Sequence, residues 1–221
     1  GILMYSLMVG VSKVVISKPI GVELCGYGFY RGRRNKGIHD PLYSRALVLR
    51  YQDETLVIIN NDLVGVDDET IKECRRIIGR ELGVKDRNII VTSTHTHSGP
   101  ATIKLEGVGL VDKEYVSTLP EAFSECTRKA YDNMRKAKIG FGRSKISNIS
   151  FNRAIKGGSI DEEVRVLHIK DYMSRPLATI FNYSCHAVSI DVRTEAGFYV
   201  SADWPGFAMR TIEAVSYTHL R

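Results

Sequence analysis

The stretch Asn88-Ile89-Ile90-Val91-Thr92-Ser93-Thr94-His95-Thr96-His97-Ser98-Gly99-Pro100 carries most of the information about the predicted fold. Its apolar first half is typical of a buried β-strand, and Gly99-Pro100 marks a turn. Side chains alternate along a strand, so His95 and His97 are expected to point to the same side where this strand ends. Paired imidazoles in such a place suit a divalent metal such as zinc. The stretch therefore predicts a sheet with a metal site at its edge.

Two strands and a helix are expected upstream of this stretch. Residues 45–51 and 55–60 are rich in β-branched and apolar residues and predict a hairpin. The acidic residues 67–69 suit the positive N-terminus of a helix, and apolar residues then recur at helical spacing up to Gly83. Cys74 lies on that apolar stripe, so we interpret it as a core residue.

Helical and strand patterns continue downstream. Residues 112–138 predict a helix that Pro120 splits or kinks, and residues 139–184 are dominated by strand patterns. His168 lies within one of these apolar strands, where a structural role is favoured. A final helix is expected after Trp204-Pro205-Gly206. Strands and helices alternate without repeats or a low-complexity linker, which predicts one α/β domain.

A third histidine follows another expected strand. Residues 176–182 form a strand-like run, and His186 comes four residues after it. Loops at strand ends are where α/β folds gather their sites. Together with His95 and His97, His186 makes a metal-dependent hydrolase the leading interpretation.

Several residues near strand ends also have alternative interpretations. A single histidine near a strand end is more often a hydrogen-bonding group than a ligand. Asp62 also follows a strand, where a capping or turn role is common. Cys185 next to His186 suggests a thiol nucleophile and its base, but adjacent strand residues point to opposite faces. These considerations favour metal chemistry at His95 and His97 over thiol chemistry.

The composition is that of an ordinary globular protein. The 221 residues are 43% hydrophobic and 25% charged, with a formal net charge of +6. Basic residues are scattered apart from residues 31–36, which we interpret as a solvated loop, so a nucleic-acid partner is not expected. The four cysteines include no C-x-x-C pair, which excludes a zinc ribbon and a thioredoxin-type redox pair and favours a reducing compartment.

The two ends of the sequence carry separate expectations. Residues 1–10 are apolar but too short to span a bilayer and lack a basic leader, so we expect no transmembrane segment and a cytoplasmic location. Residues 215–221 resemble the translation of a sequencing-library adapter, and His219 then carries no meaning. The expected domain is therefore 1–214, with a natural protein that continues past Ala214. The sequence does not indicate an oligomeric state.

Several motifs occur in an order that resembles the N-terminal part of the neutral/alkaline ceramidase family, particularly its shorter bacterial members. The resemblance implies an α/β, mixed-sheet, ceramidase-like catalytic domain that is truncated at its C-terminus. It covers nearly the whole chain up to Ala214, and its most specific piece is residues 94–100. The motifs are residues 39–47, Thr94 to Pro100, Asn152-Arg153, residues 161–167, Cys185-His186 and Ser201-Ala202-Asp203-Trp204-Pro205-Gly206.

Ceramidases of this family are zinc amidases that cut the N-acyl bond of ceramide. The resemblance implies that His95 and His186 are Zn²⁺ ligands and that His97 lies beside the metal, near the substrate or the developing oxyanion. Arg153 matches an arginine that faces the reacting group. The family's remaining ligands, a Glu and a Tyr, and its Gly-Asp-x-Ser-Pro segment with a proposed nucleophilic serine are absent here. The isolated chain is accordingly expected to be inactive.

The sequence also departs from the family pattern. Ala101-Thr102 stands where glycines are common, and Ala187 stands where a proline is common. Neither change removes a ligand, but both alter the surroundings of the site. The resemblance implies that the substrate is a ceramide-like lipid, with a water-soluble amide or ester as the alternative. A non-catalytic binding homologue is the third interpretation.

Overall fold

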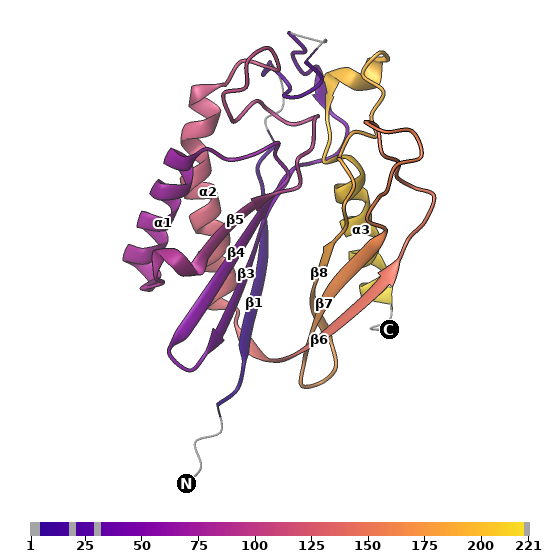
Figure 1. Cartoon of the computed structure of the whole chain (residues 1–221). Coiled ribbons are helices and arrows are strands. Elements are labelled where there is room, and N and C mark those ends of the chain that lie inside the picture. Colours follow the sequence, from indigo (N-terminus) through magenta and orange to yellow (C-terminus); the bar gives the residue numbers. More distant parts are fainter. Residues whose placement is uncertain (1–4, 18–20, 29–31, 219–221) are drawn as a thin grey trace.

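The chain forms a mixed β-sheet with helices, as shown by a computed structural model that describes residues 5–17, 21–28 and 32–218 (Figure 1). The large sheet has seven strands in the order β5-β4-β3-β1-β6-β7-β8. Strands β4 and β5 pair in parallel, and the other neighbours in this sheet are antiparallel. These strands are β1 (Met8–Val15), β3 (Tyr43–Tyr51), β4 (Glu54–Asn61), β5 (Ile89–Ser93), β6 (Arg135–Lys145), β7 (Glu163–Asp171) and β8 (Pro176–Asn182). The predicted α/β mixed-sheet class is confirmed.

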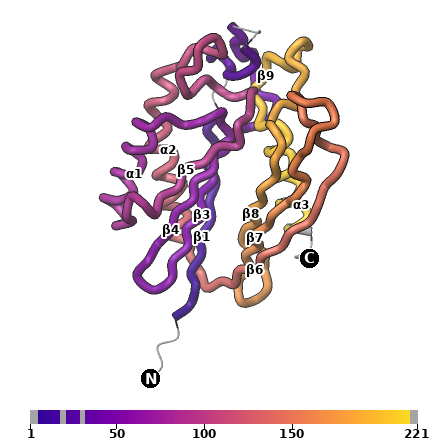
Figure 2. The backbone as a smooth tube through the Cα atoms, viewed as in Figure 1, coloured from indigo at the N-terminus to yellow at the C-terminus, as the bar shows by residue number. Residues whose placement is uncertain are grey.

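The sheet consists of two halves that meet at one short seam. Strands β1 and β6 pair only through Met8 with Lys136 and Val9 with Arg135. Away from that seam the halves diverge, as Figures 1 and 2 show, and the loops after β5 and β8 lie at the far end. A small parallel pair, β2 (Gly37–Ile38) and β9 (Tyr199–Val200), lies at that same end.

Two helices cover one face of the first half. Helix α2 (Lys113–Asp132) packs on β1 and β3, and helix α1 (Asp68–Leu82) packs on α2. Phe123 and Leu119 of α2 are fully or almost fully buried in the resulting core, and Cys74 of α1 joins them as expected. Gly10 on β1 permits this close packing, because a Cβ there would overlap the Ala130 carbonyl oxygen of α2.

The predictions for the β3–β4 hairpin and for α1 are confirmed. Strands β3 and β4 pair from Ser44–Asn61 to Tyr51–Glu54. The Asp67 side chain accepts a hydrogen bond from the Thr70 backbone N–H at 2.7 Å, which satisfies one free donor of the first turn of α1. Gly83 ends the helix in the left-handed conformation, with φ of 68°.

Helix α2 differs from its expectation. It continues through Pro120 without splitting and ends at Asp132, so residues 133–138 are not helical and β6 begins at Arg135. Proline removes one intrahelical hydrogen bond. Here the turns on both sides of Pro120 bury Leu119 and Phe123 in the main core, and this packing offsets the loss.

Helix α3 (Asp203–Thr218) begins before Trp204-Pro205-Gly206, earlier than predicted. Pro205 fits there because the first turn of a helix contains N–H groups that need no intrahelical partner. The expected domain end at Ala214 falls inside this helix, and residues 219–221, including His219, lie outside the described residues. Across the described ranges, no helix is long and apolar enough to cross a membrane.

Candidate metal centre

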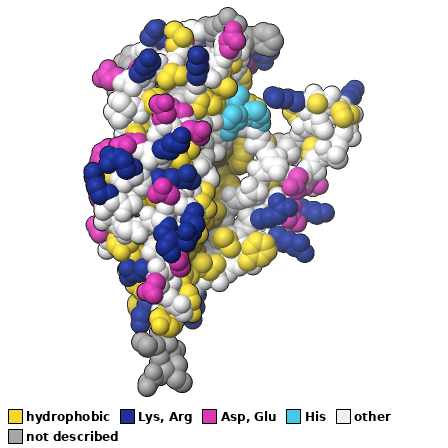
Figure 3. Space-filling model, turned by 60° about the vertical axis from the view of Figure 1, so that its left-hand side comes forward, with side chains coloured by type: hydrophobic (Ala, Val, Ile, Leu, Met, Phe, Trp, Pro, Cys, Tyr) yellow, Lys and Arg dark blue, Asp and Glu magenta, His cyan; other side chains and the backbone are white. Residues whose placement is uncertain are grey.

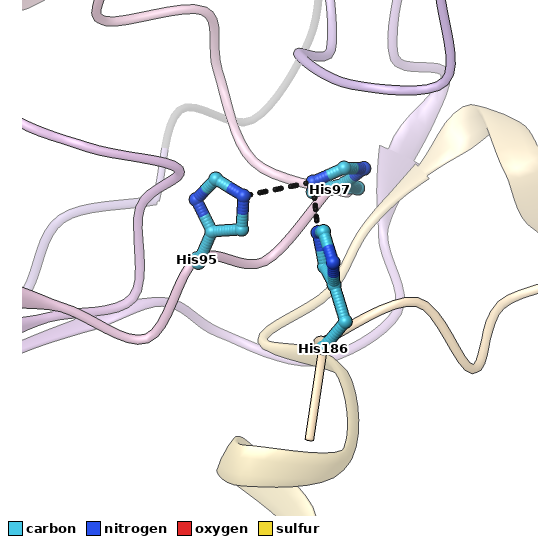
Figure 4. A group of neighbouring side chains, drawn as sticks. All are labelled: His95, His97 and His186. Carbon is cyan, nitrogen blue, oxygen red and sulfur yellow. Dashed lines mark hydrogen bonds between the residues drawn. The ribbon is translucent and has the colours of Figure 1, made fainter. Parts of the chain in front are cut away.

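Three histidines from two distant loops come together, as the sequence predicted. His95 and His97 lie in the loop after β5, and His186 lies in the segment after β8 (Figure 4). The Nε2 atom of His97 is 3.2 Å from Nε2 of His95 and 3.0 Å from Nε2 of His186. One candidate ligand atom from each residue lies within 4.8 Å of the others, so the group could hold a metal ion.

The convergence of His95 and His97 has a different origin from the one predicted. Strand β5 ends at Ser93, so strand alternation does not align the two rings. His95 instead adopts a left-handed backbone conformation, with φ of 66°. Its backbone N–H donates to the Leu63 carbonyl at 3.0 Å, which ties the loop to the end of β4. The loop conformation therefore brings the two rings together.

A backbone carbonyl determines which ring nitrogen of His95 is free. Nδ1 of His95 lies 2.6 Å from the Val64 carbonyl oxygen. A carbonyl can only accept a hydrogen bond, so Nδ1 carries the proton and Nε2 of the neutral ring keeps a lone pair. Metal-binding histidines are commonly oriented by such a bond to the remote nitrogen. His95 is thus prepared to bind a metal through Nε2.

The surroundings of the other two rings favour their neutral form. Burial, followed by the neighbouring rings of His186 and His95, lowers the pKa of His97 to about 4. Burial and the His95 ring also lower the pKa of His186. A neutral imidazole is the form that binds metals, because protonation blocks the lone pair.

The nitrogen spacing around His97 is close to the spacing of ligands in a tetrahedral metal site. Ligands at the usual Zn–N distance of 2.0–2.1 Å on a tetrahedron are about 3.3 Å apart. The two Nε2–Nε2 distances from His97, 3.2 Å to His95 and 3.0 Å to His186, lie within a few tenths of an ångström of that spacing, and all three candidate ligand atoms lie within 4.8 Å of one another. Figure 3 shows histidine side chains reaching the surface between the two halves of the molecule, so a ligand can approach them. The division of roles between His97 and the two predicted ligands stays a prediction.

The N-terminus of α3 holds the His186 segment, a role that the sequence analysis did not assign. The Trp204 indole N–H donates to the His186 carbonyl oxygen at 3.2 Å. The Asp203 carboxylate accepts hydrogen bonds from the backbone N–H and the hydroxyl of Ser189, the latter at 2.8 Å. Both residues belong to the 201–206 motif. The only sequence signal for a role in the site was that this motif follows the others in the order found in the ceramidase family.

The interpretation of residues 31–36 as a solvated loop is wrong for Arg33. Arg33 is only 2% exposed, and its guanidinium donates to the carbonyl oxygens of His97 and Gly197, each at 2.7 Å. Backbone carbonyls from distant segments thus replace water around the charge. Arg34 is exposed as expected, and Arg31 lies outside the described residues.

Arg153 lies near the centre without touching it. It is exposed on the segment between β6 and β7 and makes no hydrogen bond or ion pair with any residue that the structure describes. Its positive charge nevertheless helps to lower the pKa of His186, after burial and the His95 ring. Its predicted role of facing the reacting group stays a prediction.

The remaining candidates make structural contacts, and Asp62 bonds to β3 instead of taking the expected capping or turn role. Asp62 is fully buried and accepts hydrogen bonds from Arg45 at 2.8 Å and from the Tyr43 backbone N–H at 2.9 Å. The thiol of Cys185 donates to the His186 carbonyl oxygen, and burial raises the pKa of Cys185. His168 bonds to Thr179 across β7 and β8.

Gly26 is expected to be essential for the position of His97. A Cβ at Gly26 would overlap the His97 ring, and the backbone there has φ of 101°. We expect Gly26→Ala to lower the free energy of unfolding by roughly 2–4 kcal/mol and to weaken metal binding. The control is Gly32→Ala, with φ of 71° and no heavy atom of the described residues within 4 Å of the added Cβ, which is expected to cost only about 1 kcal/mol. Equal effects of the two variants, measured by denaturant unfolding and zinc titration, would contradict this account.

Comparison with known proteins identifies the family. The sequence model described as "Neutral/alkaline non-lysosomal ceramidase, N-terminal" matches residues 7–219. The chain belongs to this ceramidase family. Neutral ceramidase A of Dictyostelium discoideum is 24% identical over 229 residues, covering 92% of this chain and 31% of the relative. The Pseudomonas aeruginosa neutral ceramidase is 24% identical over 208 residues, covering 85% of this chain and 30% of the relative.

Solved ceramidase structures share the fold. The crystal structure of the P. aeruginosa neutral ceramidase matches with a TM-score of 0.81 at 23% identity, covering 93% of this chain and 35% of that one. A structure described as "Ceramidase complexed with C2" matches with a TM-score of 0.78 at 22% identity, covering 93% of this chain and 34% of that one. The ceramidase-like fold is therefore confirmed, and the chain spans about a third of the length of these relatives.

Proposed function

We propose that this chain is the metal-binding N-terminal part of a zinc-dependent hydrolase that cleaves the N-acyl amide bond of a ceramide-like substrate. The observation that carries the proposal is the meeting of the Nε2 atoms of His95, His97 and His186. Membership of the ceramidase family supports the substrate class. The activity is proposed for the whole protein, because the chain matches only about a third of its relatives.

The donor set favours zinc. Neutral imidazole nitrogens suit zinc, whereas magnesium and calcium prefer oxygen ligands. His95 and His186 would hold the ion through Nε2, and the Val64 carbonyl orients the first of these rings. When bound, zinc supplies a Lewis acid and lowers the pKa of a coordinated water to about 7.

His97 and Arg153 would stabilise the negative charge that develops on the carbonyl oxygen of the scissile amide. The neutral His97 ring can donate one N–H, and its edge-to-face contact with Tyr27, with ring centroids 5.1 Å apart, fixes the ring plane. Arg153 offers an exposed positive charge beside His186. Loss of one such donor typically costs about 2.7–4 kcal/mol of transition-state stabilisation.

We further propose that turnover needs residues outside these 221. The family resemblance assigns two more zinc ligands and a proposed nucleophilic serine to segments that this sequence does not contain. The isolated chain is therefore expected to bind zinc without hydrolysing an amide. Reading the source DNA across Ala214 and Val215 would establish whether the frame continues into a Gly-Asp-x-Ser-Pro segment.

The deciding experiment expresses the complete reading frame and measures hydrolysis of a ceramide and of a short N-acyl amino compound. We expect ceramide cleavage that is lost on chelation and restored by zinc. Cleavage of only the short compound would favour a water-soluble substrate. Zinc binding without cleavage of either, in a frame that lacks the serine segment, would favour a binding homologue and contradict the proposed hydrolase.

A further inference from the structure

Arg33 is a buried cation directly behind the metal centre. Its Nη1 donates to the Gly197 carbonyl at 2.7 Å, and its Nη2 donates to the His97 carbonyl at 2.7 Å and, more weakly, to the Cys25 carbonyl at 3.4 Å. These three carbonyls belong to segments that are far apart in the sequence. One guanidinium therefore joins the loop that carries His97 to the chain that leads into β9 and to the segment around Cys25.

The burial of this charge needs an explanation. An arginine stays protonated in proteins, and a buried charge is costly unless it is well partnered. Arg33 forms no ion pair with any described carboxylate, and its Nε has no hydrogen-bond partner within the described part of the chain. Among the described residues, its compensation is the set of backbone carbonyls and an aromatic ring. Such an arrangement is poor for stability alone, since an apolar side chain of similar volume would avoid the desolvation cost.

The aromatic ring belongs to Tyr27, which contacts both Arg33 and His97. The guanidinium carbon of Arg33 lies 5.1 Å from the Tyr27 ring centroid, and the His97 ring packs edge-to-face on that ring. The Tyr27 hydroxyl donates to the Ile190 carbonyl at 3.3 Å, four residues after His186. Arg33 and Tyr27 thus connect the loop of His97 with the segment that follows His186.

We propose that Arg33 is a positioning residue for the metal centre. Its planar fork holds the main chain of His97 beside that of Gly197, and Tyr27, which contacts both Arg33 and His97, reaches the segment after His186, so that the imidazole nitrogens meet before a metal arrives. A lysine cannot reproduce this role, because its single ammonium lacks the fork that reaches His97 and Gly197 together. The inference rests on the proposed metal function of the histidines.

The first test compares zinc affinities of Arg33→Met, Arg33→Lys and a matched control, Arg34→Met, in the 221-residue chain. Arg34 lies in the same loop, but its side chain is 65% exposed and donates to the Gly21 carbonyl. We expect Arg33→Met to raise the zinc Kd about 10–100-fold, the usual effect of losing a residue that orients a ligand, because the loop that Arg33 holds also carries the predicted ligand His95. Arg33→Lys is also expected to raise the zinc Kd, and it replaces Arg33→Met in the test if Arg33→Met does not fold. Arg34→Met is expected to leave the Kd within about twofold of the parent.

Denaturant unfolding of the same variants separates positioning from general stability. A cooperatively folded Arg33→Met variant with the parent zinc Kd would overturn the proposal.

A second readout needs no metal. Ring resonances of isotopically labelled histidines in the metal-free chain are expected to move for His97 in Arg33→Met but not for His168, which lies on β7 outside the centre. A parent chain that binds no zinc would refute the proposed function, and these resonances would still test the positioning role. Unchanged His97 resonances would refute that role independently.

Discussion

Replacing His186 with alanine is expected to abolish stoichiometric zinc binding by this chain, and His95→Ala is expected to do the same. Each substitution removes one of the converging Nε2 donors. The loss should exceed the roughly 10–100-fold effect of removing a residue that only orients a ligand, because a direct donor is removed. Isothermal titration with zinc, after exhaustive chelation, measures both stoichiometry and Kd.

His168→Ala is the matched control for these two variants. His168 lies on β7 and bonds to Thr179 on β8, outside the three-histidine group. Its substitution should leave the zinc stoichiometry and Kd at the parent values. Zinc retained at full stoichiometry and parent affinity by His95→Ala or His186→Ala would refute the ligand assignment. Loss of zinc in His168→Ala would show that the measurement reports folding instead.

The largest expected loss of stability follows from Phe123→Ala. Phe123 on α2 is fully buried in the core between the helices and the first half of the sheet. Removing a buried phenylalanine ring typically costs about 3–5 kcal/mol, because apolar contacts are lost and a cavity remains. For a chain of this size, that loss lowers Tm by roughly 6–20 °C. Denaturant and thermal unfolding both measure it.

Phe141→Ala is the control for this loss. Phe141 on β6 is 69% exposed, so its truncation is expected to change the free energy of unfolding by no more than about 0.5 kcal/mol. At temperatures where both variants are folded, each should keep the parent zinc Kd, because neither residue contacts the histidine group. Equal destabilisation by the two variants would contradict the assigned core.

Local signals were sufficient to predict the elements that depend on nearby residues. Helix α1 was predictable because Asp67 and Gly83, its two capping residues, lie beside the helix that they cap. Helix α2 was only partly predictable, because its continuation through Pro120 depends on tertiary packing of the neighbouring turns. Propensity alone cannot report that packing.

The candidate site was predictable in its residues but not in its geometry. The H-x-H pattern and His186 identified the three rings, yet the left-handed backbone at His95 replaced the expected strand alternation. Arg33 was missed because its burial depends on carbonyls from Cys25, His97 and Gly197, up to 164 positions away in the sequence. No local pattern can report such contacts.

The most direct test of the metal centre is the position of zinc in crystals of the zinc-loaded chain. Anomalous difference maps recorded on either side of the zinc absorption edge locate the ion independently of any assumed ligand. The account predicts one peak at the three-histidine group, about 2.0–2.1 Å from Nε2 of His95 and of His186. A fully occupied zinc peak elsewhere, with none at these histidines, would contradict it.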